Sequence, residues 1–72
     1  MRLRYDQETD SLYIDLKEGP GVDPREIHEG IVIDLDKNDH PVGIDIQHAG
    51  EILDLGTLEA EGLPLTTLKV AG

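Results

Sequence analysis

Residues Ile31-Val32-Ile33-Asp34-Leu35-Asp36 and residues Val42-Gly43-Ile44-Asp45-Ile46-Gln47 decide the fold of this chain. In both stretches apolar and polar side chains alternate with a period of two, the pattern of a β-strand that buries one face. A third stretch, Ser11-Leu12-Tyr13-Ile14-Asp15-Leu16-Lys17, alternates in the same way. The inward positions of the three strands predict a core made of Leu12, Ile14, Leu16, Ile31, Ile33, Leu35, Val42, Ile44 and Ile46.

The remaining segments are assigned from their turn and breaker residues. Residues 2–6 form a shorter predicted strand, and polar turns follow it and the strand over residues 31–36. Residues 18–30 hold three glycines and two prolines and are predicted to be a loop, which Ile27 anchors to the core. A short helix is predicted over residues 49–55. Residues 1–55 then form the single domain, and residues 56–72 form a tail, either a helix or an edge strand.

These elements predict an α+β fold, a four-stranded antiparallel β-meander whose short C-terminal helix covers the apolar face of the sheet. The chain has 72 residues and no cysteine, so it can use neither a large core nor disulfides for stability. Small domains of this kind often gain stability by oligomerising, and we therefore expect a homodimer.

Composition excludes several classes of function. Sixteen acidic residues against six basic ones give a net charge of −10, which argues against binding to nucleic acid or to an anionic membrane. The absence of cysteine removes thiol nucleophiles and thiolate metal sites. No apolar run is long enough for a membrane span, and the first residues lack the apolar core of a signal peptide. We expect a cytoplasmic protein, and a basic protein partner suits its charge.

Hairpin register follows from keeping inward side chains opposite one another. In the first hairpin this places Arg2 opposite Asp15, where the two side chains would form an exposed ion pair worth about 0–1 kcal/mol. The other expected partners are Tyr5 with Leu12, Arg4 with Tyr13, Leu35 with Val42, Asp34 with Gly43, and Val32 with Asp45.

The outward face of the predicted sheet gathers most of the chemistry in the sequence. The simplest interpretation is a solvated face whose acids prevent aggregation between sheet edges. A polar interaction surface is the functional interpretation. Its candidate residues are Arg2, Arg4, Tyr13, Asp15, Asp34 and Asp45.

Two chemical alternatives use the same acids. A divalent cation could bind Asp34, Asp36, Asn38 and Asp45, because residues 34–45 begin like a calcium loop. However, the loop's sixth position is Asp39 rather than glycine, and its twelfth is an aspartate rather than a bidentate glutamate. Acid–base catalysis by paired carboxylates needs a cleft that an open strand face does not supply. The three histidines lack the spacing of metal ligands. We expect no catalytic residues and no cofactor.

The stretch Tyr5-Asp6-Gln7-Glu8-Thr9-Asp10-Ser11-Leu12-Tyr13-Ile14 resembles the YDxExDxLYI opening of a family of small prokaryotic proteins, domain of unknown function 2283. Glu26-Ile27, residues 30–36 and residues 42–46 continue the resemblance, which covers about residues 2–53. This chain has Asp45 where that family usually has glutamate, and His40-Pro41 where a turn with glycine is common.

The resemblance implies a compact β-sheet with a helix and no established activity. In some relatives it also implies a small toxin-like protein encoded alongside. We therefore expect a non-enzymatic protein–protein interaction module, acting in a homo-oligomer, as the neutralising partner of a small basic protein, or both. The alternative is a binder of a divalent cation or small ligand.

Overall fold

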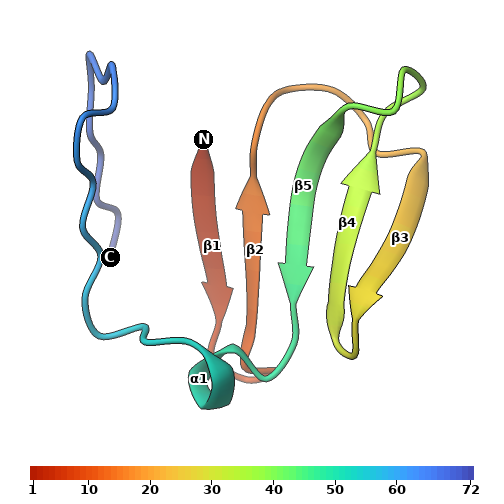
Figure 1. Ribbon diagram of the computed structural model, residues 1–72. Coiled ribbons are helices and arrows are strands. Elements are labelled where there is room, and N and C mark those ends of the chain that lie inside the picture. Colours follow the sequence, from red (N-terminus) through yellow and green to blue (C-terminus); the bar gives the residue numbers. More distant parts are fainter.

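The structure, a computed structural model, describes residues 1–72 and contains one antiparallel sheet, one helical turn and an extended C-terminal segment (Figure 1). No helix in it is long and apolar enough to cross a membrane. The elements in chain order are β1 (Arg2–Asp6), β2 (Ser11–Asp15), β3 (Asp23–His28), β4 (Ile31–Leu35), β5 (Pro41–Ile46) and α1 (Ala49–Ile52).

The strand order is β1-β2-β5-β4-β3, so the predicted four-stranded meander is wrong. Strand β2 pairs with β5 instead of with the next strand along the chain. The connection over residues 16–22 therefore leads from β2 past β5 and β4 to the far edge of the sheet (Figure 1). The period-two pattern identifies strands locally but does not state which strands pair over long distances.

Strand β3 lies where the sequence predicted a loop. Its residues are mostly polar, it contains Pro24, and it pairs only with β4. Proline is tolerated on such an edge because its missing N–H can face outward. The register shifts between Glu26 and His28, and Ile27, which lies between them, is 59% exposed. Ile27 therefore does not anchor this segment to the core.

The register of the first hairpin is as predicted, with Tyr5 opposite Leu12 and Arg4 opposite Tyr13. In the second hairpin Asp34 lies opposite Gly43, as predicted. The prediction fails at the end of that hairpin, where an irregularity after Asp34 places Leu35 opposite Pro41 instead of Val42. Val42 is buried outside the main cluster, beside the β2–β3 connection, where a Cβ on Gly21 would lie 3.3 Å from its Cγ2.

Aligned strand positions define two faces. The apolar face consists of two rows of side chains that each cross all five strands. On β3, one row ends at the Arg25 guanidinium and the other at the His28 imidazole. The polar face lies on the other side of the same strands. The apolar face contains Leu3, Ile14, Ile44, Ile33 and Arg25, then Tyr5, Leu12, Ile46, Ile31 and His28; the polar face contains Arg4, Tyr13, Asp45, Val32 and Glu26, then Arg2, Asp15, Gly43, Asp34 and Pro24.

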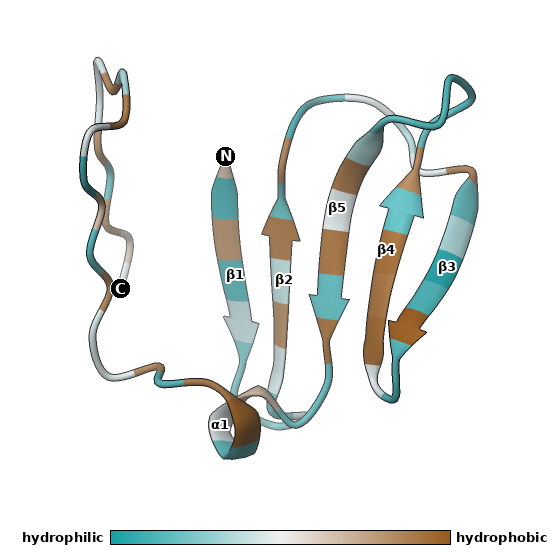
Figure 2. Cartoon of the chain, viewed as in Figure 1, coloured by the Kyte–Doolittle hydropathy of each residue, from teal (hydrophilic) through white to brown (hydrophobic).

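The core lies at one end of the apolar face, where α1 meets the sheet. Ala49 is fully buried against Leu12 and Ile46, and the half-buried Ile14, Ile31 and Ile44 pack around them. Helix α1 is a single turn of four residues, shorter than predicted, and it contacts the sheet mainly at β2. It covers one end of the apolar face and leaves the remainder open, contrary to the predicted cover (Figure 2).

The C-terminal segment, residues 53–72, forms neither the helix nor the edge strand considered from sequence. It leaves α1, lies outside the sheet on the side of β1 and doubles back on itself (Figure 1). Every residue in it is exposed, including Leu58 at 76%, Leu68 at 72% and Val70 at 91%. Within this chain, none of its side chains is therefore buried.

Candidate functional site

The polar face places most of the predicted interaction residues next to one another, starting at β1. The Arg4 guanidinium lies 5.1 Å from the centre of the Tyr13 ring. It also donates to the Asp15 carboxylate through Nε, at 3.0 Å, and through Nη2, at 3.4 Å. The ion pair predicted between Arg2 and Asp15 is therefore wrong: although Arg2 is opposite Asp15 in the register, the side chain that reaches the carboxylate is Arg4.

Tyr13 extends these contacts across the sheet. Its hydroxyl donates a hydrogen bond of 2.8 Å to Oδ2 of Asp34 on β4, although β5 lies between the two strands. The ring can cross β5 because Gly43 has no side chain: a Cβ there would lie 2.0 Å from the Tyr13 oxygen. The hydrogen bond to Asp34, together with desolvation, raises the pKa of Tyr13 to about 12. Tyr13 is thus a structural bridge that stays protonated at neutral pH.

Asp36, a candidate cation ligand, is engaged at the β4–β5 turn. Its carboxylate accepts the Lys17 ammonium at 2.8 Å and the backbone N–H groups of Asn38 and His40. The Lys17 bond, then the His40 N–H, hold the pKa of Asp36 well below its ordinary value. Asp39 in the same turn has a φ of 63°, the left-handed conformation that aspartate and asparagine tolerate best after glycine.

The structure does not bring the candidate cation ligands together. The Asp34 side chain bonds to Tyr13, and the Asp36 side chain bonds to Lys17 and to its own turn. The Asp45 side chain makes no hydrogen bond or ion pair. No group of three acidic or histidine side chains in the chain has the spacing to hold a metal ion. The Asn38 contribution is a backbone N–H directed at Asp36, whereas a cation would need its side-chain oxygen.

Asp45 borders an open hollow on the polar face, beside β1 and β2. The hollow has a volume of about 360 Å³ and is open to solvent. Small-molecule sites are usually enclosed and mostly apolar, whereas only two of the seven residues here are hydrophobic. They are Arg4, Tyr5, Asp6, Thr9, Ser11, Tyr13 and Asp45. A paired-carboxylate mechanism needs an acid with a raised pKa, but the two acids whose pKa values are shifted, Asp10 and Asp36, are both lowered.

Sequence reasoning missed a clamp between the first hairpin and α1. Oδ1 of Asp10 accepts the Tyr5 hydroxyl at 2.7 Å and the Gly50 N–H at 2.8 Å, and the Asp10 carbonyl accepts the Ala49 N–H. The two bonds to the carboxylate lower the pKa of Asp10, with the Tyr5 bond contributing most. Asp10 has a φ of 53°. An aspartate placed where a turn requires left-handed backbone was the available signal.

Several polar residues within residues 5–14 have structural roles. Asp6 accepts the Glu8 N–H within the β1–β2 turn, Tyr5 and Asp10 hold α1, and Tyr13 bridges to Asp34. Each of these polar side chains therefore makes a contact that stabilises the fold.

Fold and polar face together define a small antiparallel β-sheet protein with one acidic, hydrogen-bonded face and one open apolar face. The chain belongs to the family described as "Protein of unknown function (DUF2283)", whose family model matches residues 2–49, 48 of its 72 residues. The matched range holds all five strands and ends at the first residue of α1. No curated protein and no solved structure matches the chain.

Proposed function

We propose that this chain is a non-enzymatic protein–protein interaction module that binds a polypeptide over the apolar face of its sheet. The observation that supports this proposal is the open apolar face itself. Its two rows contain eight large apolar or aromatic side chains. Leu12 and Ile46 are buried, Leu3 and Tyr5 are 45% and 49% exposed, and the four isoleucines between them, Ile14, Ile31, Ile33 and Ile44, are half-buried. Contiguous exposed apolar surface on a small domain is typical of an interaction site.

The opposite face supports a second candidate partner, a small basic polypeptide. The chain has a net charge of −10. Asp45 and Glu26 both lie on the polar face, and neither forms an ion pair within the chain. A basic partner would meet these carboxylates and would bind less tightly as salt screens the charges.

Native mass spectrometry of the protein purified gently from its own host tests the proposal. We expect a mass above the 7.9 kDa of one chain. Ile44→Lys, in the centre of the apolar face, should abolish the excess mass, whereas Val32→Lys, its matched control on the polar face, should not. Circular dichroism checks that both variants remain folded. A bare chain of 7.9 kDa at every concentration would contradict the proposal.

Salt distinguishes the two partners in the same experiment. A complex held by the apolar face should persist or strengthen as the salt concentration rises, because hydrophobic association is not screened. A complex with a basic polypeptide should dissociate with rising salt. Asp45→Asn should then weaken it, whereas Asp54→Asn, outside the sheet, should have little effect.

A further inference from the structure

We infer that the polypeptide on the apolar face is a second copy of this chain, and that the C-terminal segment of each copy packs against the other copy. This inference rests on the proposed function and names its partner. It begins from the amount of exposed surface. A folded monomer of 7.9 kDa has an accessible surface of about 4,400 Å², whereas this chain exposes 6123 Å².

The surplus, about 1,700 Å² per chain, matches a particular class of interface. Standard complexes bury about 800 Å² per partner, and obligate homodimers bury about 1,000–2,500 Å² per partner. Removing the surplus from each of two copies would therefore produce a homodimer of ordinary size. The chain alone has more open surface than its length explains, and a second identical chain would remove the same excess from both.

The sheet alone is too small to account for this surplus. Five strands about 4.8 Å apart, each about 17–20 Å long, cover a projected area of only about 450 Å². The C-terminal segment accounts for much of the rest, since residues 53–72 are all exposed. Its apolar side chains include Leu58, Leu63, Leu65, Leu68 and Val70, all more than half exposed. An interface that accounts for the surplus must include this segment.

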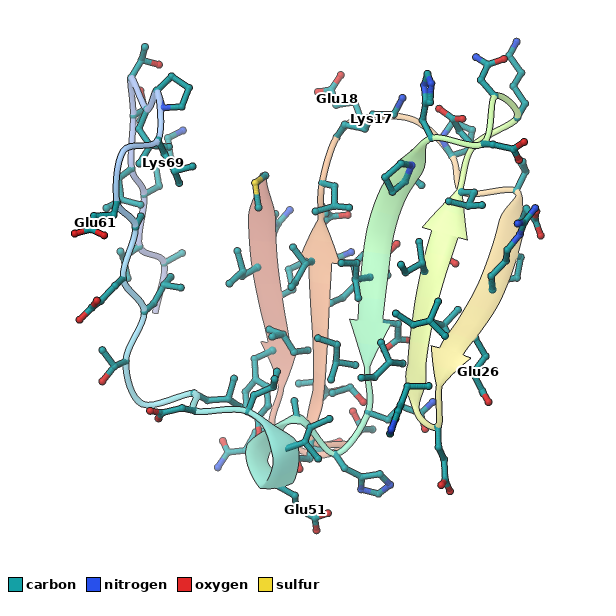
Figure 3. The ribbon with its side chains drawn as sticks, in the orientation of Figure 1. Lys17, Glu18, Glu26, Glu51, Glu61 and Lys69 are labelled. Atoms are coloured by element: carbon teal, nitrogen blue, oxygen red, sulfur yellow. The ribbon has the colours of Figure 1, made fainter.

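The segment's position favours the partner's surface over its own sheet. It leaves α1 at the end of the sheet and continues outside β1, where Glu61 and Lys69 project from it (Figures 1 and 3). A two-fold arrangement makes the same patch of both copies contact each other. With two apolar faces packed about 10 Å apart, each C-terminal segment beside β1 is placed to border the partner's sheet.

Charge also favours a second copy on this face. Each chain has a net charge of −10, so two copies would repel if their polar faces met. The two rows of the apolar face contain no acid, and their charged or titratable ends are Arg25 and His28 on β3. Two copies can therefore meet over these rows while both polar faces remain in solvent. The carboxylates nearest the rows, Asp23 and Asp10, are already bonded to Arg25 and to Tyr5.

The test measures the mass of the full chain by sedimentation equilibrium across the micromolar range. We expect about 16 kDa, twice the mass of one chain. The double variant Leu65→Glu with Leu68→Glu should raise the dissociation constant about a hundredfold or more, from the lost burial of two leucines. Both side chains are more than half exposed in the single chain, so the variant should leave the protomer fold intact. Its matched control, Thr66→Glu with Thr67→Glu, adds the same charge to the same segment and should change the constant severalfold at most.

The outcomes separate this inference from the proposed function. A dimer that the leucine variant does not weaken would overturn the inference and leave the interaction module standing. A monomer bound to a different polypeptide in the host would do the same. A monomer with no partner would overturn both. In a dimer of one labelled and one unlabelled copy, isotope-filtered NMR should show contacts between leucine methyls of the C-terminal segment and isoleucine methyls of the other copy. Contacts within one chain only would overturn the inference that the segment packs against the other copy.

Discussion

Gly43→Ala is expected to destabilise the protein, although alanine is ordinarily the better strand residue. The added Cβ would lie 2.0 Å from the Tyr13 oxygen and 2.5 Å from Cζ, so the phenol must leave its place and release Asp34. The lost bond to a carboxylate costs about 1.5 kcal/mol at the low end of its range, because the face is open to water. The lost contact between Arg4 and the ring costs about 0.5 kcal/mol.

The opposing effect is the restricted unfolded state of alanine, which returns about 0.5–1 kcal/mol. The net loss is then about 1–1.5 kcal/mol, or roughly 4–12 °C in Tm for a domain of this size. Thermal unfolding followed by circular dichroism measures it, at one fixed chain concentration because association shifts Tm. Gly56→Ala, where only Asp54 at 3.8 Å lies near the new Cβ, serves as the control and should be neutral or slightly stabilising.

The double mutant decides whether the clash with Tyr13 is the cause. In a Tyr13→Ser background the ring is absent, so Gly43→Ala should become neutral or slightly stabilising. An equal loss in both backgrounds would refute the reasoning. The phenol titration offers an independent check, because the chain has only two tyrosines. Asp34→Asn should bring the pKa of Tyr13 down from about 12 toward its ordinary value of 10, without moving the titration of Tyr5.

Two further predictions concern the acids engaged in turns. Asp10→Ala removes the acceptor of the Gly50 N–H, so hydrogen exchange at Gly50 should accelerate while exchange in β4 stays unchanged; equal acceleration in both would mean that Asp10 acts on the whole fold. The lowered pKa of Asp36 contributes stability that is complete above its ordinary value of 3.8 and is lost as the pH falls below it. Lys17→Met should therefore reduce the free energy of unfolding at neutral pH and reduce its fall between pH 7 and pH 3, both measured by urea unfolding. If the free energy of unfolding falls by the same amount in the variant, Lys17 does not contribute.

The first hairpin shows how much local sequence can predict. Alternation identified β1 and β2, and matching their inward residues gave the observed register from Arg2 to Asp6. These features depend on the nearest neighbours in the chain, and the period of two reports them directly.

Strand β3 and the strand order show where prediction stops. Residues 23–28 were predicted to be a loop because they are polar and lie among glycines and prolines. They form an edge strand because pairing with β4 supplies its hydrogen bonds. The pairing of β2 with β5 joins residues about thirty positions apart. It depends on which set of long-range backbone bonds is best for the whole sheet, and no local pattern contains that comparison.

The candidate site divides in the same way. Sequence placed Arg4, Tyr13, Asp15, Asp34 and Asp45 on one face, and the structure places them there. That Arg4 rather than Arg2 pairs with Asp15, and that Tyr13 reaches Asp34 over Gly43, are facts of side-chain reach between strands.

By itself the sequence determined four of the strands, the two faces of the sheet, the first register and an acidic surface, because strand alternation and charge are properties of local residue order. The tertiary structure alone decided the strand order, the edge strand β3, the clamp of Asp10 on α1 and the openness of the apolar face. Each of these depends on which distant segments meet and how far a helix of four residues can cover a sheet of five strands.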